Sequence, residues 1–381
     1  MRVENDLRND PIRPLVLRIA IPSMLAQFVS VLYSVVDRIY IGNIPEVGSL
    51  ALAGAGVCGP IVTMLGSVAF WVGVGGSPLV SIRLGEGRRE QAKQIVANAF
   101  LLLIVMSLAL MGVAYATRRP ALMLFGASPE TLPYAMEYYS WYLTGTVFAL
   151  LSTGMNQFVI CQGFAQKGMQ SVILGAVMNI VLDPLFIFGL KMGVKGAAAT
   201  ISQSFMLVVT MPLGGMTGGT ASILGYNLGA GQPKRILEAQ KYILIIAVAY
   251  TGVLCLVGQL FAAPFTRIFT PDVQVSALAV TAIRITSMGI VPLGVQYVIV
   301  DGLTGMGMMR YSLPLSAFRK LVYFVAIFIL PAAFGAMAIF FAEPISDLIP
   351  PVVTVLFYWR KIPWLKRQAL LHGQPEKTTQ A

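Results

Sequence analysis

Three polar side chains lie inside long apolar stretches, at positions where they could bind a cation or carry a proton. Asp37 lies in YSVVDRIYIG, and Asn179 and Asp183 lie in MNIVLDPLFIFG. A carboxylate at the centre of a bilayer costs about 2.5–3.5 kcal/mol on insertion scales, so such residues usually face a bundle interior and mark an ion or proton path. Residues spaced i, i+4 point to the same side of a helix, so Asn179 and Asp183 can converge on one cation. Two structural alternatives stay open. Asp37 could form an interfacial pair with Arg38, and Asn179 with Asp183 could be a buried pair that caps the helix broken at Pro184.

Two further residues of the first apolar stretch bear on this chemistry. Tyr33 lies one helical turn before Asp37 and on the same face. Pro22 lies fifteen residues before Asp37, and a proline inside a helix frees a backbone carbonyl and allows a bend. We therefore predict a hinge at Pro22 in the helix that carries Asp37.

Other acidic residues lie at the ends of apolar stretches or in the last one. Asp301 falls at the end of its stretch, and we expect a solvated helix end there. Glu343 and Asp347, in AEPISD, share one helical face. For these two residues a functional role and a buried structural role are equally consistent with the sequence.

The composition indicates a membrane protein with many spans. Of 381 residues, 11% are charged and 57% are hydrophobic, whereas a soluble domain has about 25% charged residues. Cys58, Cys161 and Cys255 show no metal-ligand spacing, and the single histidine, His372, lies in the polar C-terminal tail. We therefore expect no enzyme, no cofactor, no zinc site and no nucleic-acid partner, since the net charge of +11 is not clustered on a soluble face.

Apolar runs of about 20 residues can each cross a bilayer as a helix. The sequence predicts ten such spans, near residues 15–41, 52–83, 94–117, 133–157, 170–190, 197–226, 240–263, 275–300, 313–334 and 336–358. With the N-terminus in the cytoplasm, 20 of the 27 basic residues, among them Arg319 and Lys320, fall on the cytoplasmic side. The positive-inside rule then predicts that both termini are cytoplasmic, in a multi-pass protein of a cell inner (plasma) membrane.

The chain repeats itself. LGEG at 84–87 and LGAG at 228–231 are 144 residues apart, and residues 157–160 with Gly163 match residues 296–299 with Gly302 at an offset of 139. Four predicted spans separate the two LGxG loops, so both copies have the same orientation, as in the parallel repeats of transporters. The second copy has too little chain before its LGAG. We therefore expect about two helices to be absent at the centre, and 197–226 to begin as the last helix of copy one and end as the second helix of copy two.

These residues resemble the multidrug and toxin compound extrusion (MATE) family of cation-coupled antiporters. The similar stretches cover most of the chain: 20–42, 75–92, 178–203 with N-x-x-x-D-P and GAAAT, 223–236, and 342–349. The resemblance implies an all-α fold of two six-helix lobes around a cavity that opens alternately to each side. Applied to this chain, it predicts about ten helices in place of twelve, an N-terminal lobe at 1–205, a C-terminal lobe at 206–358 and a basic cytoplasmic tail at 359–381.

The resemblance also implies the functional residues. Family members hold a cation with the first-helix Asp, the fifth-helix Asn and Asp, and a sixth-helix Thr, which correspond here to Asp37, Asn179, Asp183 and Thr200. Asn156 matches another polar residue of that pocket, and with Tyr33 it is expected to line the substrate cavity. These side chains offer the hard oxygen ligands that suit Na⁺. The implied function is export of cationic, amphiphilic xenobiotics by a monomer in the lipid bilayer, in exchange for Na⁺ or H⁺.

Three alternatives remain. A lipid-linked oligosaccharide flippase of the same superfamily would need several cavity cations, whereas only Arg284 lies deep in a predicted span. An intramembrane aspartyl protease would need a GxGD sequence, which this chain lacks. A shortened family member without transport activity is the third alternative, because a central segment is missing.

Overall fold

The computed structural model describes residues 5–42, 48–174, 197–269, 273–334 and 336–372, and its regular structure there is helical. A short helical segment at 165–174 follows α4. The helices are α1 (Ile12–Gly42), α2 (Gly48–Gly85), α3 (Arg89–Leu124), α4 (Leu132–Cys161), α6 (Ala197–Gly229), α7 (Pro233–Leu260), α8 (Ala262–Phe269), α9 (Val273–Ser287), α10 (Ile290–Gly305), α11 (Met309–Phe334), the 3₁₀ helix η1 (Ala336–Phe341) and α12 (Ala342–His372). The predicted all-α class is confirmed.

Six helices within these described ranges are long and apolar enough to cross a membrane, and a bent pair makes a seventh candidate. That pair falls at the span predicted at 275–300, and α9 and α10 meet there at an angle of 49°. The N–H groups of Met288 and Gly289 donate to carbonyls three residues earlier, at 3.2 and 3.4 Å. A last turn of this tightened kind ends a helix, so α9 stops and α10 starts in a new direction.

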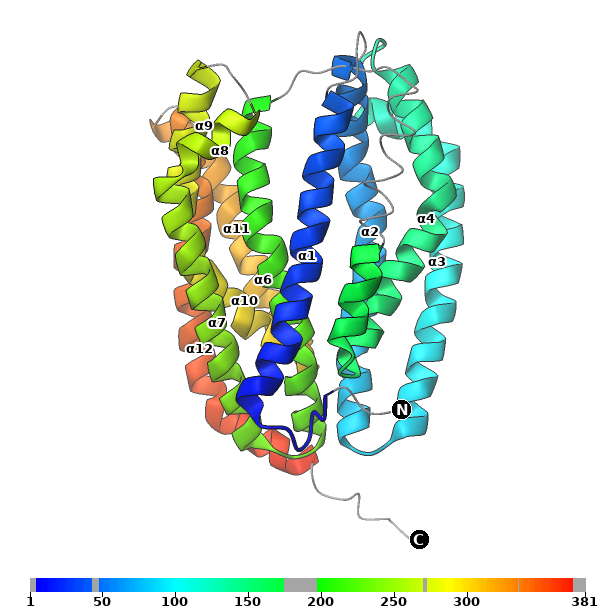
Figure 1. Cartoon of the computed structure of the whole chain (residues 1–381), viewed down its shortest axis with the longest axis vertical. Helices are drawn as coiled ribbons and strands as arrows, with labels where there is room; N and C mark the ends of the chain where they lie inside the picture. The colour runs from blue at the N-terminus through cyan, green and yellow to red at the C-terminus, as the bar shows by residue number, and fades with distance from the viewer. Residues whose placement is uncertain (1–4, 43–47, 175–196, 270–272, 335, 373–381) are drawn as a thin grey trace.

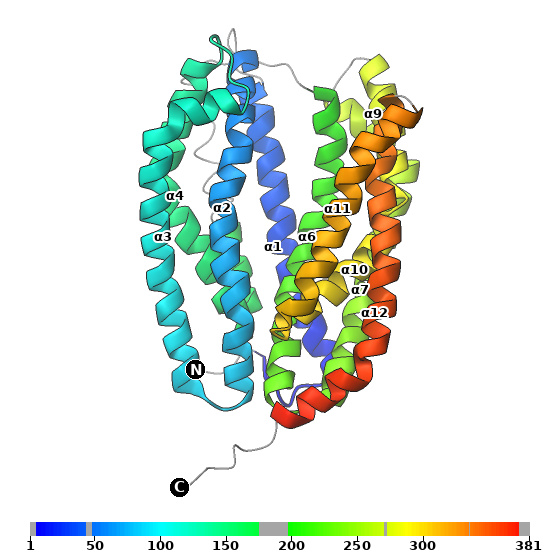
Figure 2. The same cartoon turned by 180° about the vertical axis from the view of Figure 1, so that it is seen from behind.

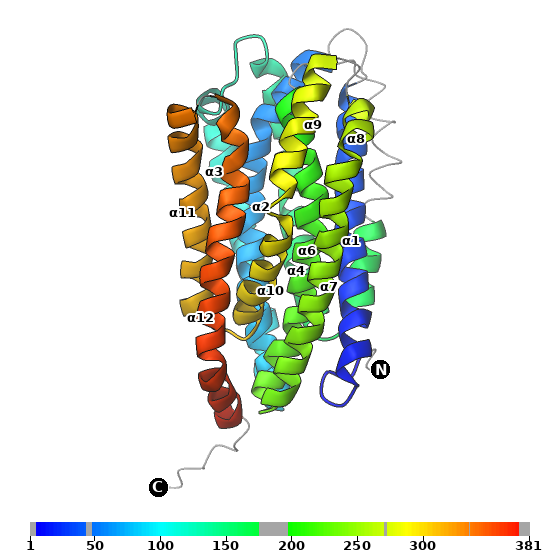
Figure 3. The same cartoon turned by 90° about the vertical axis from the view of Figure 1, so that its left-hand side faces the viewer.

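The helices form an elongated bundle in which α6 lies between two groups (Figures 1 and 2). On one side α6 packs against α1 and α2, and on the other it packs against α7, α9 and α10. The start of α1 and the end of α12 lie at the same end of the bundle (Figures 1 and 3). The basic segment that begins at residue 359 continues α12 as far as His372.

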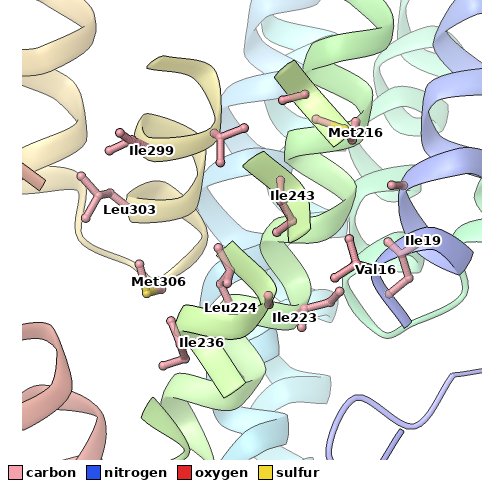
Figure 4. Packing of buried hydrophobic residues seen from close by; sticks show 14 of the residues in the cluster. Val16, Ile19, Met216, Ile223, Leu224, Ile236, Ile243, Ile299, Leu303 and Met306 are labelled. Atoms are coloured by element: carbon pink, nitrogen blue, oxygen red, sulfur yellow. The ribbon is translucent and has the colours of Figure 1, made fainter. Parts of the chain in front are cut away.

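The buried core lies where α1, α6, α7 and α10 meet. Figure 4 shows apolar side chains from these four helices pointing toward one another, among them Val16, Leu224, Ile243 and Leu303. Many large apolar side chains are instead exposed on the outside, as Trp71 and Phe148 are at 73% and 76%. An apolar exterior of this extent is what a bilayer solvates.

The internal repeat is present in the backbone at a constant offset of 144. The turn glycines Gly87 and Gly231 have φ of +79° and +69°, and Gly163 and Gly307 have φ of +94° and +72°. Each pair is 144 residues apart, and glycine tolerates this left-handed region because it has no Cβ. The offset of 139 predicted from the apolar match at 157–163 is therefore wrong. Turn glycines are fixed by backbone geometry, whereas apolar helix residues recur by chance.

The two copies also contact each other reciprocally where α2 crosses α6. A Cβ added to Gly85 would lie 3.0 Å from the carbonyl carbon of Tyr226 and closer still to its oxygen. A Cβ added to Gly229 would meet the carbonyl of Ile82 in the same way. Because residues 82 and 226 are also 144 apart, the contact is self-complementary, as across a two-fold axis. Small residues at such a crossing let the two backbones approach closely.

The bounds of α6 match those of helices in both copies. Its last residue, Gly229, is 144 residues after Gly85, the last residue of α2. Its first residue, Ala197, is 144 residues before Phe341, which directly precedes α12. A single helix thus has the register expected for the end of copy one and for the second helix of copy two.

Candidate functional site

Most of the predicted cation site lies outside what the structure describes. Asn179 and Asp183 fall in the undescribed range 175–196. Asp37 and Tyr33 lie on α1, and Thr200 lies in the first turn of α6, but the placements of these three side chains are also outside the described part. Among the described residues, no group of three or more His, Cys, Asp or Glu side chains could hold a metal ion. The assignment of these residues stays a prediction.

Pro22 lies within α1, beside a close crossing of α1 with α6. The neighbouring Ser23 is buried, and a Cβ added to Gly215 would lie 2.6 Å from the Ser23 carbonyl oxygen. A Cβ on Gly219 would also collide with the Ser23 side chain. Because α1 and α6 are in close contact at this level, a bend at Pro22 would have to move α6 or separate the two helices.

Asn156, the predicted cavity residue, lies near the end of α4 and is half-buried. Its Oδ1 accepts a hydrogen bond of 3.4 Å from the hydroxyl of Ser171. A Cβ added to Gly168 would come within 2.9 Å of the same Oδ1. Asn156 therefore faces the helical segment that follows α4 (residues 165–174), and its place in a substrate cavity remains a prediction.

In the second copy, Asp301 of α10 accepts a hydrogen bond from the hydroxyl of Thr217 on α6. The carboxylate is partly buried between the two helices, so the expected solvated helix end is wrong. With the register of the turn glycines, Asp301 corresponds to Gln157 and Thr217 corresponds to Gly73. The first copy has a close contact at the same place, since a Cβ on Gly73 would lie 2.9 Å from Cγ of Gln157.

An ion pair within the second copy joins α11 to α12, which run side by side (Figures 2 and 3). Nη2 and Nε of Arg319 lie 2.8 and 2.9 Å from Oδ1 of Asp347. The Asp347 side chain is fully buried and that of Arg319 is 15% exposed. The count of basic residues put Arg319 on the cytoplasmic side without indicating this buried ion pair. The position of Arg319 inside the apolar run 313–334 was the available signal.

The surroundings of this pair are polar on one side and tightly packed on the other. The Arg319 guanidinium lies 6.0 Å from the centre of the Tyr297 ring, at the limit of a cation–π contact. Within the described chain, Oδ2 of Asp347 is buried without a hydrogen-bond partner. A Cβ added to Gly289, at the break between α9 and α10, would lie 2.7 Å from Cβ of Asp347. Glu343 lies one turn earlier on α12 and is half-buried.

This arrangement brings acidic groups of α10 and α12 into the interior of the second copy, with one bonded to a hydroxyl and one to a guanidinium. The Arg319 charge already balances Asp347, whereas the hydrogen-bond donor to Asp301 among the described residues is the neutral Thr217 hydroxyl. A carboxylate with one neutral donor can take up a proton or a cation, so Asp301 is the described acid best placed for such exchange.

Comparison with known proteins matches the MatE family model to residues 22–185 and 191–329. An FAD transporter of Shewanella oneidensis is 28% identical over 220 residues, which are 56% of this chain and 47% of that protein. The multidrug export protein MepA of Staphylococcus aureus is 22% identical over 268 residues, 67% of this chain and 57% of that protein. The chain thus spans about half the length of the curated relatives it matches.

The fold also matches solved structures. An outward-facing multidrug resistance MATE family transporter of the MOP superfamily superposes with a TM-score of 0.86 at 19% identity, covering 95% of this chain and 98% of that one. At this level of identity the likeness establishes the fold, an all-helical multi-pass membrane protein.

Proposed function

The chain belongs to the MatE family of transporters, which are not enzymes, and we propose that it exports cationic, amphiphilic compounds in exchange for Na⁺ or H⁺. The family match and the MATE fold support the proposal, together with the sequence, which has Asp37, Asn179 and Asp183 inside apolar stretches. The multidrug export name of the MepA relatives supports a drug-like cargo.

Coupling is proposed to work by competition in the N-terminal half. Asp37 and Asp183 would share one low-dielectric pocket with Asn179 and Thr200, and binding of Na⁺ or H⁺ would neutralise it. Loss of that negative charge would lower the affinity for a cationic cargo, and a bend of α1 at Pro22 would release the cargo outward. Because binding of the two cations is linked, each lowers the affinity for the other by the same factor.

The topology is part of the same proposal. The basic residues near the common end of α1 and α12 support a cytoplasmic location of both termini in a cell inner membrane. The double register of α6 supports two lobes that meet within it, near residue 205, and a chain that lacks about two central helices compared with a twelve-helix member.

Dye export from cells tests the coupling site. Cells that produce the chain should keep less of a cationic fluorescent dye than cells with an empty vector, and Asp37→Asn should abolish the difference. Tyr115→Phe, a mild change of a residue that is 45% exposed on α3, serves as the control. Export by the Asp37→Asn variant equal to the parent would refute coupling through Asp37.

A second version with the missing helices restored tests whether the short chain is competent. If only the restored version exports dye, the short chain is an inactive family member. If neither does, the cargo class is wrong.

One relative favours a different cargo. The FAD transporter matches at 28% identity, against 22–26% for the MepA proteins. Release of FAD from cells should therefore be measured beside dye export. FAD release without dye export would replace the cationic drug by an anionic dinucleotide as the substrate class.

A further inference from the structure

A groove of about 540 Å³ opens between α2, α3 and α4 in the first copy of the repeat. Its volume falls in the range of small-molecule sites, roughly 300–1,000 Å³. Apolar side chains, among them Val96, Phe100 and Met155, form most of its wall. Arg89 and Lys93, in the first two turns of α3, also line it. The groove therefore combines an apolar wall with two cations at one end.

The cations are available to a ligand. Arg89 and Lys93 are both exposed, and their i, i+4 spacing puts them on one face of α3. Lys93 pairs with Glu90 at 2.7 Å, but the side chains are 71% and 79% exposed, and such surface pairs contribute little. Over residues 83–93 basic side chains outnumber acidic ones four to two, so the local field favours an anion.

In the second copy, larger apolar side chains that are packed against the core occupy several of the equivalent positions. At the offset of 144, Ala92 corresponds to Ile236, which is fully buried, and Gln162 corresponds to Met306, which is 2% exposed. Lys93 corresponds to Leu237, which packs against the same core cluster. The equivalent helices α6, α7 and α10 thus enclose packed side chains, as Figure 4 shows for Ile236 and Met306. At these positions the first copy therefore departs from the chain's own symmetry.

We propose that this groove binds an anionic phospholipid. The phosphate would lie against Arg89 and Lys93, and an acyl chain would run along Val96, Phe100 and Met155. Basic pockets between membrane helices bind acidic headgroups in this way. The start of α3 lies at the same end of the bundle as the start of α1 (Figure 2), where a headgroup of that leaflet would be.

Native mass spectrometry of the full chain, delipidated in detergent, tests the proposal by titration with phosphatidylglycerol or phosphatidylcholine. We expect one phosphatidylglycerol to bind in preference to phosphatidylcholine. Arg89→Gln with Lys93→Gln should weaken phosphatidylglycerol about thirtyfold, from the contribution of each basic residue near an acidic headgroup. Lys234→Gln with Lys241→Gln makes the same charge change on exposed residues of α7 and should leave binding unchanged.

A second variant tests the apolar part without any change of charge. Ala92→Ile with Gln162→Met gives the first copy the residues of the second and should fill the groove, so phosphatidylglycerol binding should fall at least tenfold. Thermal unfolding within a few degrees of the parent establishes that each variant is folded.

Three results would overturn the proposal. If the α7 control variant weakened phosphatidylglycerol binding equally, general surface charge would be what holds the lipid. Undiminished binding to the filled variant would exclude the groove. Displacement by millimolar glycerol phosphate would mean that the site takes a free phosphate and not a lipid.

Discussion

The reciprocal crossing of α2 and α6 gives the sharpest test of the structure. An alanine at Gly85 would put its methyl carbon 3.0 Å from the carbonyl carbon of Tyr226, and closer to the oxygen. A Cα–H···O contact needs about 3.3–3.6 Å between carbon and oxygen. The obstacle is backbone, which cannot rotate away, so the two helices must move apart.

The magnitude follows from two opposed contributions. Overpacking costs about 1–3 kcal/mol, and a backbone obstacle argues for the upper end. Alanine in place of glycine in a helix gains about 0.5–1 kcal/mol. We therefore expect Gly85→Ala to lower the free energy of unfolding by about 2 kcal/mol. Gly229→Ala should cost the same, because it meets the Ile82 carbonyl in the equivalent way.

The assay is reversible unfolding of the purified chain in mixed micelles, followed by helical circular dichroism. Gly112→Ala is the matched control, because nothing lies within 4 Å of a Cβ added there in α3, and it should be neutral or stabilising. In the double variant of Gly85 and Gly229, one separation of the helices relieves both contacts, so the combined loss should be smaller than the sum. If Gly85→Ala were as stable as Gly112→Ala, or if the two crossing glycines differed widely, the reciprocal crossing would be refuted.

Three further predictions concern named polar contacts. Arg319→Met should cost about 3–5 kcal/mol of stability, because it leaves the Asp347 charge buried without its ion partner. Adding Asp347→Leu should restore most of this stability. Equal stability of the single and double variants would argue against the pair. Thr217→Val should cost about 1.5–3 kcal/mol by removing a donor to the α10 carboxylate, whereas Thr217→Ser should unfold like the parent, and a loss of the same size for serine would point to packing instead. The side-chain amide of Asn9 lowers the pKa of Asp6 below its ordinary 3.8. Asp6 therefore stabilises the fold above that pH, and this stabilisation is lost as the pH falls through the lowered value. Between pH 5 and 3 the melting temperature should fall less steeply for Asp6→Asn than for the parent, and parallel curves would contradict this.

The sequence predicted much of the fold because the relevant signals are local. An apolar run long enough to cross a bilayer specifies a helix by itself. A turn that needs positive φ selects glycine wherever it occurs, and this is why LGEG and LGAG marked the repeat correctly. The match between residues 157–160 and 296–299 gave the wrong repeat offset, because apolar helix positions accept many similar side chains. A short match there carries little information on register.

The candidate site was predictable only in part. Asp37, Asn179 and Asp183 are recognisable as costly residues within apolar stretches, and the resemblance adds Thr200. The sequence showed Arg319 as one of many basic residues near a membrane surface, and showed Asp301 as a helix end. Nothing local indicates that a guanidinium of α11 meets a carboxylate of α12, or that a hydroxyl of α6 reaches α10.

By itself, then, the sequence determined the class of protein, the family and the offset at the LGxG loops, since each depends on composition, on short motifs or on a single turn. Only the tertiary structure decided which buried charges are neutralised, how the two copies meet at Gly85 and Gly229, and why one copy has a basic groove where the other is packed. Those features depend on the spacing between helices far apart in the chain, and that spacing is set by side-chain volume at their crossings, which no segment specifies alone.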